Sequence, residues 1–130
     1  MIFGVGTDLV ELARVEQTLA RFGERFVQHL LMPEELALYA TTKRPARFLA
    51  MRFAAKEAIV KAMGTGFAHG VWIRDTGFVP DRRGRPMVVF SERGAAVCRE
   101  LGAGAAHVSL TDEAGLIAAF AVIEERSAAV

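Results

Sequence analysis

Three charged residues in two separate segments are the strongest candidates for chemistry. In an extended strand, Gly4, Gly6 and Asp8 would share one side, because alternate side chains point the same way. Glu57 and Lys61 are four residues apart in a predicted helix and so share one face. Mg²⁺ prefers oxygen ligands and commonly takes one or two carboxylates together with substrate phosphates. The pattern therefore predicts a Mg²⁺ site formed by Asp8 and Glu57, with Lys61 adding positive charge for a phosphate-bearing substrate.

Each of these residues also has an ordinary structural explanation. The glycines could allow tight packing of a helix over the strand, with Asp8 capping the helix that begins near Glu11. Glu57 and Lys61 could form a solvated ion pair worth ~0.3–0.5 kcal/mol. The alanine-rich sequence around them instead favours an interior helix whose charged row faces a cleft.

A glycine-containing loop follows this helix. Gly64, Thr65 and Gly66 could offer backbone amides to a diphosphate without steric obstruction. Two better-known phosphate motifs are absent, because Gly4-Val5-Gly6 lacks the third glycine of a dinucleotide fingerprint and no glycine loop ends in Lys-Ser or Lys-Thr. Ordinary Rossmann and P-loop folds are thus excluded.

The elements that would position these residues alternate between strands and helices. Hydrophobic periodicity and turn residues predict strands over 2–9, 71–79, 86–90, 107–110 and 116–123, and helices over 11–26, 33–39, 46–63 and 91–101. A polar turn over 80–85 predicts a hairpin. The last strand has no polar residue on either face, so we expect both faces to be covered, by the long helix or by another copy of the protein.

Composition narrows the class of protein. At 130 residues the chain fits a single domain, residues 1–130, and its net charge of +1 indicates no strong overall attraction to nucleic acid. Cys98 is the only cysteine and cannot form an internal disulfide. With neither a secretion signal nor an apolar span of ~20 residues, we expect a cytoplasmic protein that does not enter membranes.

Several segments together resemble the holo-acyl-carrier-protein synthase family of phosphopantetheinyl transferases. The matching segments are Gly4-Val5-Gly6-Thr7-Asp8-Leu9-Val10-Glu11, Arg52-Phe53-Ala54-Ala55-Lys56-Glu57-Ala58-Ile59-Val60-Lys61-Ala62, Gly64-Thr65-Gly66, the turn over 81–86 and His107-Val108-Ser109-Leu110. They occur in the family's order and span nearly the whole chain. The sequence departs from the family at Thr111-Asp112, where many members look like Ser-His, so we assign no role to Asp112.

The resemblance implies an α+β phosphopantetheinyl transferase fold, with a small antiparallel sheet packed on a long central helix. It also implies a homotrimer with active sites between subunits. The implied reaction transfers the 4'-phosphopantetheine group of coenzyme A to a serine of apo acyl carrier protein, releases adenosine 3',5'-bisphosphate and supports fatty acid biosynthesis. The serine proton would be taken by Glu57 directly or by a metal-bound water.

The resemblance also assigns residues to roles. Asp8 and Glu57 are the implied Mg²⁺ ligands and, with Lys61, the catalytic residues. The implied coenzyme A site comprises Lys61, Gly64, Thr65, Gly66 and His107. For His107, the alternative is a strand-end histidine bonded to backbone.

A basic row predicts the surface for the carrier protein. Arg14, Arg21 and Arg25 would lie on one face of the first helix, where they could steer an acidic partner at a rate that falls with salt. An ordinary solvated helix face is the alternative. A noncatalytic module that binds nucleotides or carrier protein is the competing function, and a nucleic-acid binder is weaker because no aromatic stacking row interleaves the arginines.

Overall fold

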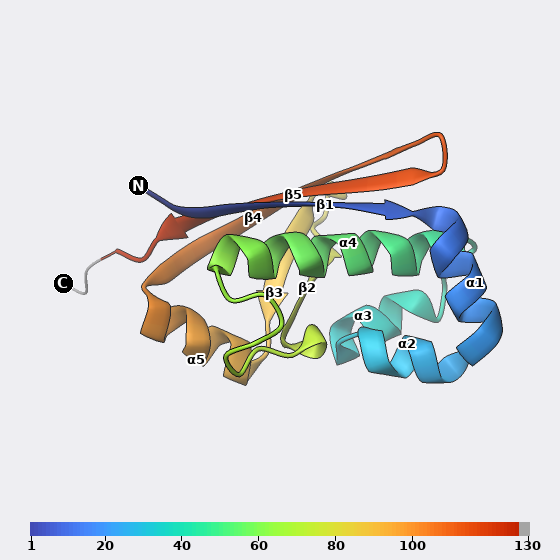
Figure 1. Cartoon of the computed structure of the whole chain (residues 1–130), viewed down its shortest axis with the longest axis horizontal. Helices are drawn as coiled ribbons and strands as arrows, with labels where there is room; N and C mark the ends of the chain where they lie inside the picture. Colours follow the sequence, from blue (N-terminus) through green and yellow to red (C-terminus); the bar gives the residue numbers. More distant parts are fainter. Residues whose placement is uncertain (128–130) are drawn as a thin grey trace.

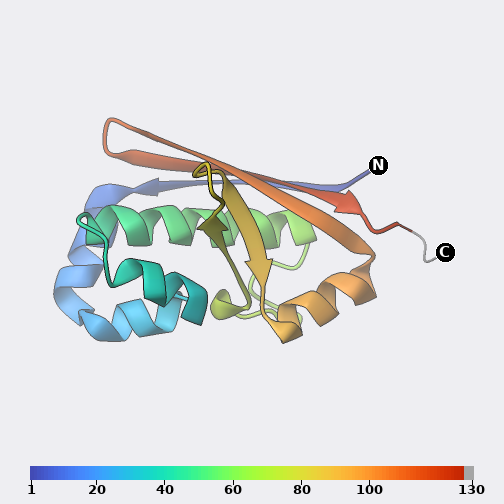
Figure 2. The same ribbon diagram turned by 180° about the vertical axis from the view of Figure 1, so that it is seen from behind.

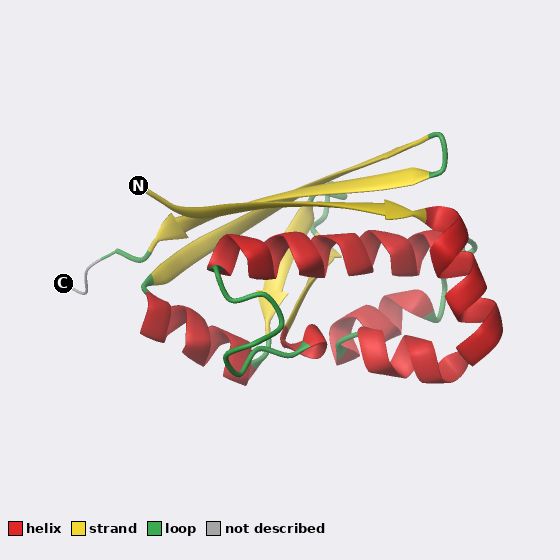
Figure 3. Ribbon diagram, in the orientation of Figure 1, coloured by secondary structure: helices red, strands yellow, loops and turns green. Residues whose placement is uncertain are grey.

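The computed structural model describes residues 1–127 as an antiparallel sheet packed against helices (Figures 1 and 3). The strands are β1 (Ile2–Glu11), β2 (Thr76–Pro80), β3 (Pro86–Phe90), β4 (Ala103–Glu113) and β5 (Leu116–Glu125). The helices are α1 (Leu12–Phe22), α2 (Glu24–Leu30), α3 (Pro33–Tyr39), α4 (Pro45–Met63) and α5 (Glu92–Leu101), with a 3₁₀ turn, η1, at Ile73–Asp75. The sheet order is β1-β5-β4-β3-β2. The predicted α+β class with an antiparallel sheet is confirmed.

The sheet curls around α4, a helix of 19 residues. β1 and β5 run along α4 on one side, and the β2–β3 hairpin crosses it behind in Figure 1 and in front in Figure 2. Pro45 occupies the first turn of α4, and Gly64 ends the helix in a left-handed conformation with φ of 83°. Different faces of α4 therefore meet different strands.

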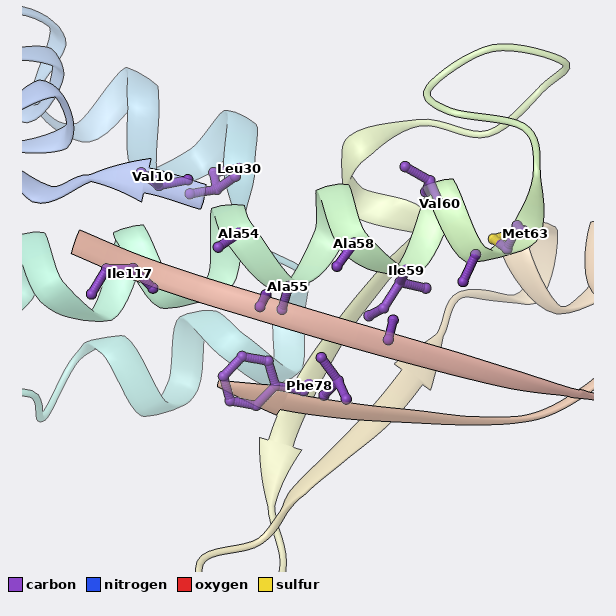
Figure 4. Close-up of a cluster of buried hydrophobic side chains, with 14 of the residues drawn as sticks. Val10, Leu30, Ala54, Ala55, Ala58, Ile59, Val60, Met63, Phe78 and Ile117 are labelled. Carbon is purple, nitrogen blue, oxygen red and sulfur yellow. The ribbon is translucent and has the colours of Figure 1, made fainter. Parts of the chain in front are cut away.

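Small side chains let the sheet approach α4 closely. Ala54, Ala55 and Ala58 of α4 are fully buried in the core, together with Ile117 of β5 (Figure 4). At β1 the approach is closer still, because a Cβ added to Gly4 would lie 2.0 Å from the carbonyl oxygen of Ala62. The expectation that glycines allow tight packing of a helix over this strand is thus confirmed.

The outer face of the sheet carries exposed apolar side chains. Leu9 of β1 and Phe120 of β5 are 64% and 47% exposed, and Val5 is exposed beside them. One face of β5 is covered by α4, as expected. No part of the described chain covers these three side chains. The expectation that both faces of the last strand are covered is therefore met on only one face within a single chain.

Three predicted elements are wrong in extent, among them the strand over 107–110, which as β4 runs from Ala103 to Glu113. The helix over 11–26 divides at Gly23, whose φ of 55° places it in a region that glycine adopts readily and that ends α1. The strand over 71–79 begins only at Thr76, because the Asp75 carboxylate accepts the backbone N–H of Trp72 and closes η1. The predicted helix cap at Ser91 is confirmed, since its hydroxyl accepts the Gly94 N–H at 3.0 Å.

Candidate active site

Asp8 and Lys61 meet where β1 crosses α4. The Lys61 Nζ lies 3.4 Å from Asp8 Oδ1 and also donates to the Thr7 carbonyl at 3.0 Å. The Asp8 side chain is 16% exposed and that of Lys61 is 50% exposed, so the lysine head remains accessible. The capping explanation for Asp8 is wrong, because Glu11 occupies the N-cap position of α1 and no side chain caps that helix.

Glu57 completes a cluster of two acids and one base. Burial raises the pKa of its carboxyl group, the negative charge of Asp8 raises it further, and Lys61 lowers it in part. Two carboxylates close enough to disfavour each other's ionisation form a site with excess negative charge. The structure thus brings together Asp8, Glu57 and Lys61, the three residues predicted to be catalytic.

Two hollows meet at Asp8. One, of about 570 Å³, lies between β1, α1 and α4 and includes Glu57 and Phe53 in its wall. The other, of about 500 Å³, is lined by Lys61 together with Thr7, Ser109 and further residues of β1, β4 and β5. A bound molecule could therefore reach Asp8 from either hollow, and Glu57 from the larger one.

The glycine loop differs from its predicted role. The backbone N–H of Gly64 donates to the Lys61 carbonyl, and those of Thr65 and Gly66 donate to the Val60 carbonyl at 3.2 and 3.1 Å. These bonds satisfy the carbonyls that the end of α4 leaves unpaired. The loop itself is confirmed, but the prediction that its amides are available to phosphate is wrong for this conformation.

His107 does not line either hollow. It lies on β4, paired with Val122, and its Nε2 is 2.7 Å from Glu124 Oε2. The alternative in which it bonds to backbone is wrong, because its partner is a side chain. His107 is exposed on the sheet and lies outside the hollows that contain Asp8 and Glu57 of the same chain.

The basic row is exposed but not continuous. Arg14 and Arg21 lie on α1, whereas Arg25 lies on α2, beyond the break at Gly23. The predicted single helix face is therefore wrong, although all three side chains remain on the surface. Arg14 also lies in the wall of the hollow that contains Glu57.

Sequence reasoning missed the apolar wall of the hollow beside Glu57 and, outside both hollows, the pairing of Arg47 with Asp112. Phe26, Val15 and Leu116 form the apolar part of the hollow beside Glu57. Arg47, at the start of α4, forms an ion pair with Asp112, the residue left without a role. The apolar stripe of the first helix was a usable signal for Val15 and Phe26, but no spacing rule links Arg47 to Asp112.

The arrangement fits a hard cation bound by few protein ligands. Within residues 1–127, no group of three or more histidine, cysteine or acidic side chains is placed to hold a metal. Asp8 and Glu57 could supply two carboxylates, and Mg²⁺ commonly takes one or two together with substrate phosphates. Burial is the main cause of the raised pKa of Glu57, and the second cause, the negative charge of Asp8, is one that a bound cation would offset.

Residues 4–121 match the 4'-phosphopantetheinyl transferase superfamily. The chain belongs to this superfamily. Among its 4'-phosphopantetheinyl transferase relatives, the holo-[acyl-carrier-protein] synthase of Nitrosospira multiformis is 43% identical over 125 residues, which cover 96% of this chain and all of the relative.

Solved structures agree with this assignment to the phosphopantetheinyl transferases. The holo-[acyl-carrier-protein] synthase from Neisseria meningitidis superposes with a TM-score of 0.92 at 38% identity, covering 96% of this chain and 100% of the other. The Bacillus anthracis holo-(acyl-carrier-protein) synthase in complex with CoA (3',5'-ADP) superposes with a TM-score of 0.79 at 32% identity, covering 98% and 99%. The resemblance seen in the sequence is confirmed.

No helix within the described part of this transferase is long and apolar enough to cross a membrane.

Proposed function

We propose that the protein is a holo-acyl-carrier-protein synthase, which moves 4'-phosphopantetheine from coenzyme A to a serine of apo acyl carrier protein. The observation that carries the proposal is the cluster of Asp8, Glu57 and Lys61 beside two hollows, in a chain whose family membership spans residues 4–121. The relatives of known structure include one bound to coenzyme A. We place the reaction in the cytoplasm, where it would supply carrier protein for fatty acid synthesis.

In the proposed reaction, the serine oxygen attacks the phosphorus that bears the pantetheine arm. A new phosphorus–oxygen bond forms to serine, and the bond to the other phosphate of the diphosphate breaks. Adenosine 3',5'-bisphosphate leaves with that oxygen, and the serine proton passes to a base. The atoms balance without an oxidant or a further co-substrate.

Asp8 and Glu57 are the residues that would hold Mg²⁺. When bound there with the diphosphate, the ion would neutralise charge on the phosphate oxygens. Lys61 is held next to Asp8 by its bond to the Thr7 carbonyl, where its ammonium group would stabilise the leaving phosphate.

Glu57 is one of two candidates for the base, and a metal-bound water is the other. Turnover of the Glu57→Gln variant at saturating Mg²⁺ tests the residue directly. Unchanged turnover would remove Glu57 from both the ligand and the base assignments.

The carrier protein would dock on α1 and α2 through Arg14, Arg21 and Arg25. Acyl carrier proteins are acidic, and a basic surface steers such a partner at a rate that falls with salt. Arg14 in the wall of the hollow would bring the docked protein next to Glu57. Charge reversal at Arg14 and Arg21 should raise KM for carrier protein but not for coenzyme A, and an unchanged KM would refute docking there.

The exposed face formed by Val5, Leu9 and Phe120 supports the proposed homotrimer. An apolar patch on a sheet is a common subunit interface, and a closed ring of three copies would cover it in every subunit. In such a ring His107, which lies on this outer side, would face a neighbouring subunit's site. Light scattering after gel filtration tests the assembly, and a stable active monomer would contradict shared sites.

The deciding experiment is intact mass spectrometry of an apo acyl carrier protein incubated with this protein, coenzyme A and Mg²⁺, with a chelator control. A phosphopantetheine mass gain that disappears with chelator supports both the transferase and its metal. No gain across several carrier proteins would favour the noncatalytic binding module.

A further inference from the structure

Three charged residues are enclosed in the interior on another face of α4. Glu35 of α3 and Lys56 of α4 are fully buried, and Arg52 of α4 is 7% exposed. Arg52 and Lys56 belong to the same family-like segment as Glu57 and Lys61, yet neither lines the hollows beside Asp8. Their chemistry is therefore not accounted for by substrate contact.

The Glu35 carboxylate is saturated with partners from three elements. Its Oε1 accepts the Lys56 ammonium at 2.6 Å and the Met32 N–H at 3.0 Å. Its Oε2 accepts the Phe78 N–H of β2 at 3.2 Å and lies 3.6 Å from Arg52 Nε. This one side chain thus connects the start of α3, strand β2 and helix α4.

The nitrogen atoms of Lys56 and Arg52 that face Glu35 also bond to the backbone of β2. Lys56 Nζ also donates to the Thr76 carbonyl at 2.6 Å, and Arg52 Nε donates to the Phe78 carbonyl at 3.3 Å. The Arg52 guanidinium lies 3.9 Å from the ring centroids of both Phe48 and Phe78. Both cations on α4 are therefore tied to the backbone of β2.

Gly77 shows how tightly β2 fits this cluster. A Cβ added to Gly77 would lie 2.3 Å from Glu35 Oε2 and 2.5 Å from its carboxyl carbon. Since the carboxylate is held by its other partners, it has no free direction in which to retreat. The strand and the charged cluster form one closely fitted unit.

Stability alone is a weak reason for such a cluster. Burial lowers the pKa of Lys56, and it lowers that of Arg52 to about 10, while Glu35 opposes both shifts. Buried ion pairs can often be replaced by apolar residues without loss of stability, but they are directional and can hold an element in one orientation. Lys56 and Glu57 are consecutive, so a helix rotation that displaces one displaces the other.

We propose that Glu35, Arg52 and Lys56 are positioning residues, which fix the rotation of α4 so that Glu57 and Lys61 face Asp8. This inference rests on the proposed transferase function. The cluster acts through α4 and does not touch substrate. Its loss should reduce turnover and metal binding, whereas carrier-protein affinity, which is set by α1 and α2, should be retained.

The test is a neutral replacement, Glu35→Gln with Lys56→Met, which removes both charges while keeping similar side-chain lengths. We expect a folded protein by circular dichroism, with kcat lowered at least tenfold and the midpoint of the Mg²⁺ titration raised at least fivefold. The rise in Tm on adding Mg²⁺ alone, a readout independent of turnover, should shrink. KM for carrier protein should change less than twofold.

Leu36→Ala is the matched control. Leu36 follows Glu35 on α3 and packs against the core without a charge. This variant should lose stability and keep the Mg²⁺ midpoint. If it shifts the midpoint as much as the neutral pair does, the effect is a general loss of structure and the inference is overturned.

Gly77→Ala is a second variant that keeps all three charges and pushes on the carboxylate instead. It should give the same pattern of lowered kcat and raised Mg²⁺ midpoint. If the Glu35→Gln, Lys56→Met protein folds and has the kinetics of the parent, the cluster has no positioning role. If neither this protein nor Gly77→Ala folds, the role of the cluster is purely structural and the inference is overturned as well. The parent protein separates the two proposals, because its own failure to transfer phosphopantetheine would overturn the proposed function instead.

Discussion

Glu57 and Lys61 face open hollows on one side of α4, whereas Arg52 and Lys56 are enclosed on another side of the same helix. The acids of the open site repel each other, and its lysine is half exposed. In the enclosed cluster, Glu35 has a backbone or side-chain partner for each carboxylate oxygen. Accessible charges that could bind a ligand and buried charges that are already paired thus lie on the same helix, as close together as the consecutive residues Lys56 and Glu57.

Loss of a charge in the open site should produce the largest effect on activity. We expect Glu57→Gln to lower kcat by at least about 100-fold, because transition-state electrostatics of this kind are worth several kcal/mol. Its Tm should stay the same or rise, since removing the charge relieves repulsion from Asp8. Thermal melts beside initial-rate assays check both. A large fall in Tm would instead make Glu57 a residue that stabilises the fold.

Loss of a charge in the enclosed cluster should instead be seen in stability. Glu35→Ala leaves two backbone N–H groups without a partner and the buried Lys56 ammonium without its counter-charge, and it should cost about 3–5 kcal/mol in the free energy of unfolding. Urea titration measures the change. Glu34→Ala is the control, because its exposed side chain should contribute less than ~0.5 kcal/mol. Equal effects of the two variants would contradict the special role of Glu35.

Gly6→Ala tests the contact that brings β1 to the open site. The added Cβ would lie 2.1 Å from the Ala58 carbonyl oxygen, so strand and helix must separate at a cost of about 1–3 kcal/mol. Activity should fall as well, because Asp8 lies on the displaced strand. Thr7→Ala, at the neighbouring outward position, controls for strand propensity. The free energies of unfolding and the reaction rates should differ clearly between the two variants. A Gly6→Ala enzyme with the stability and rate of the parent protein would rule out the tight contact.

Asp75 is a second buried acid, and it lies away from α4. Burial favours a raised pKa, but bonds from the Trp72 N–H, the Ser91 hydroxyl and Arg93 outweigh it and hold the pKa below its usual value of 3.8. The stability from Asp75 is therefore present above about pH 4 and lost as the pH falls through its lower folded-state pKa.

Asp75→Asn should cost about 1.5–3 kcal/mol at pH 7, the usual value of hydrogen bonds to a charged group. The difference from the parent should narrow as the pH falls below 4, while kcat at neutral pH stays unchanged. Urea titrations between pH 7 and 3 measure it. A difference that stays constant over this range would mean that the Asp75 charge contributes no stability.

The sequence predicts the open site better than the enclosed cluster for a physical reason. Asp8, Glu57 and Lys61 follow from strand alternation and from the four-residue spacing of a helix, which are local rules. Glu35 meets Lys56 only because α3 and β2 fold onto α4, and no periodicity connects positions 21 residues apart. The prediction that the amides of the 64–66 loop are available to phosphate also failed, because these amides donate hydrogen bonds to carbonyls at the end of α4.

The bounds of helices and strands were likewise predicted well where local residues mark them. Pro33–Tyr39 and Pro86–Phe90 were predicted to the residue, since proline and turn residues bound them in the sequence. The helix over 11–26 was predicted as one because its apolar stripe continues through Gly23 to Phe26. The backbone turns at that glycine, which separates Arg25 from Arg14 and Arg21.

The contact between Gly4 and the Ala62 carbonyl has a consequence for protein engineering. Since β1 and α4 touch backbone to backbone, the spacing between their functional groups does not depend on how large neighbouring side chains are packed. The rest of the hydrophobic interior could be redesigned or allowed to drift while this spacing is preserved. A ten-residue strand and a nineteen-residue helix, together with the residues of α3 and β2 that hold the helix through Glu35, would then be the unit to transplant.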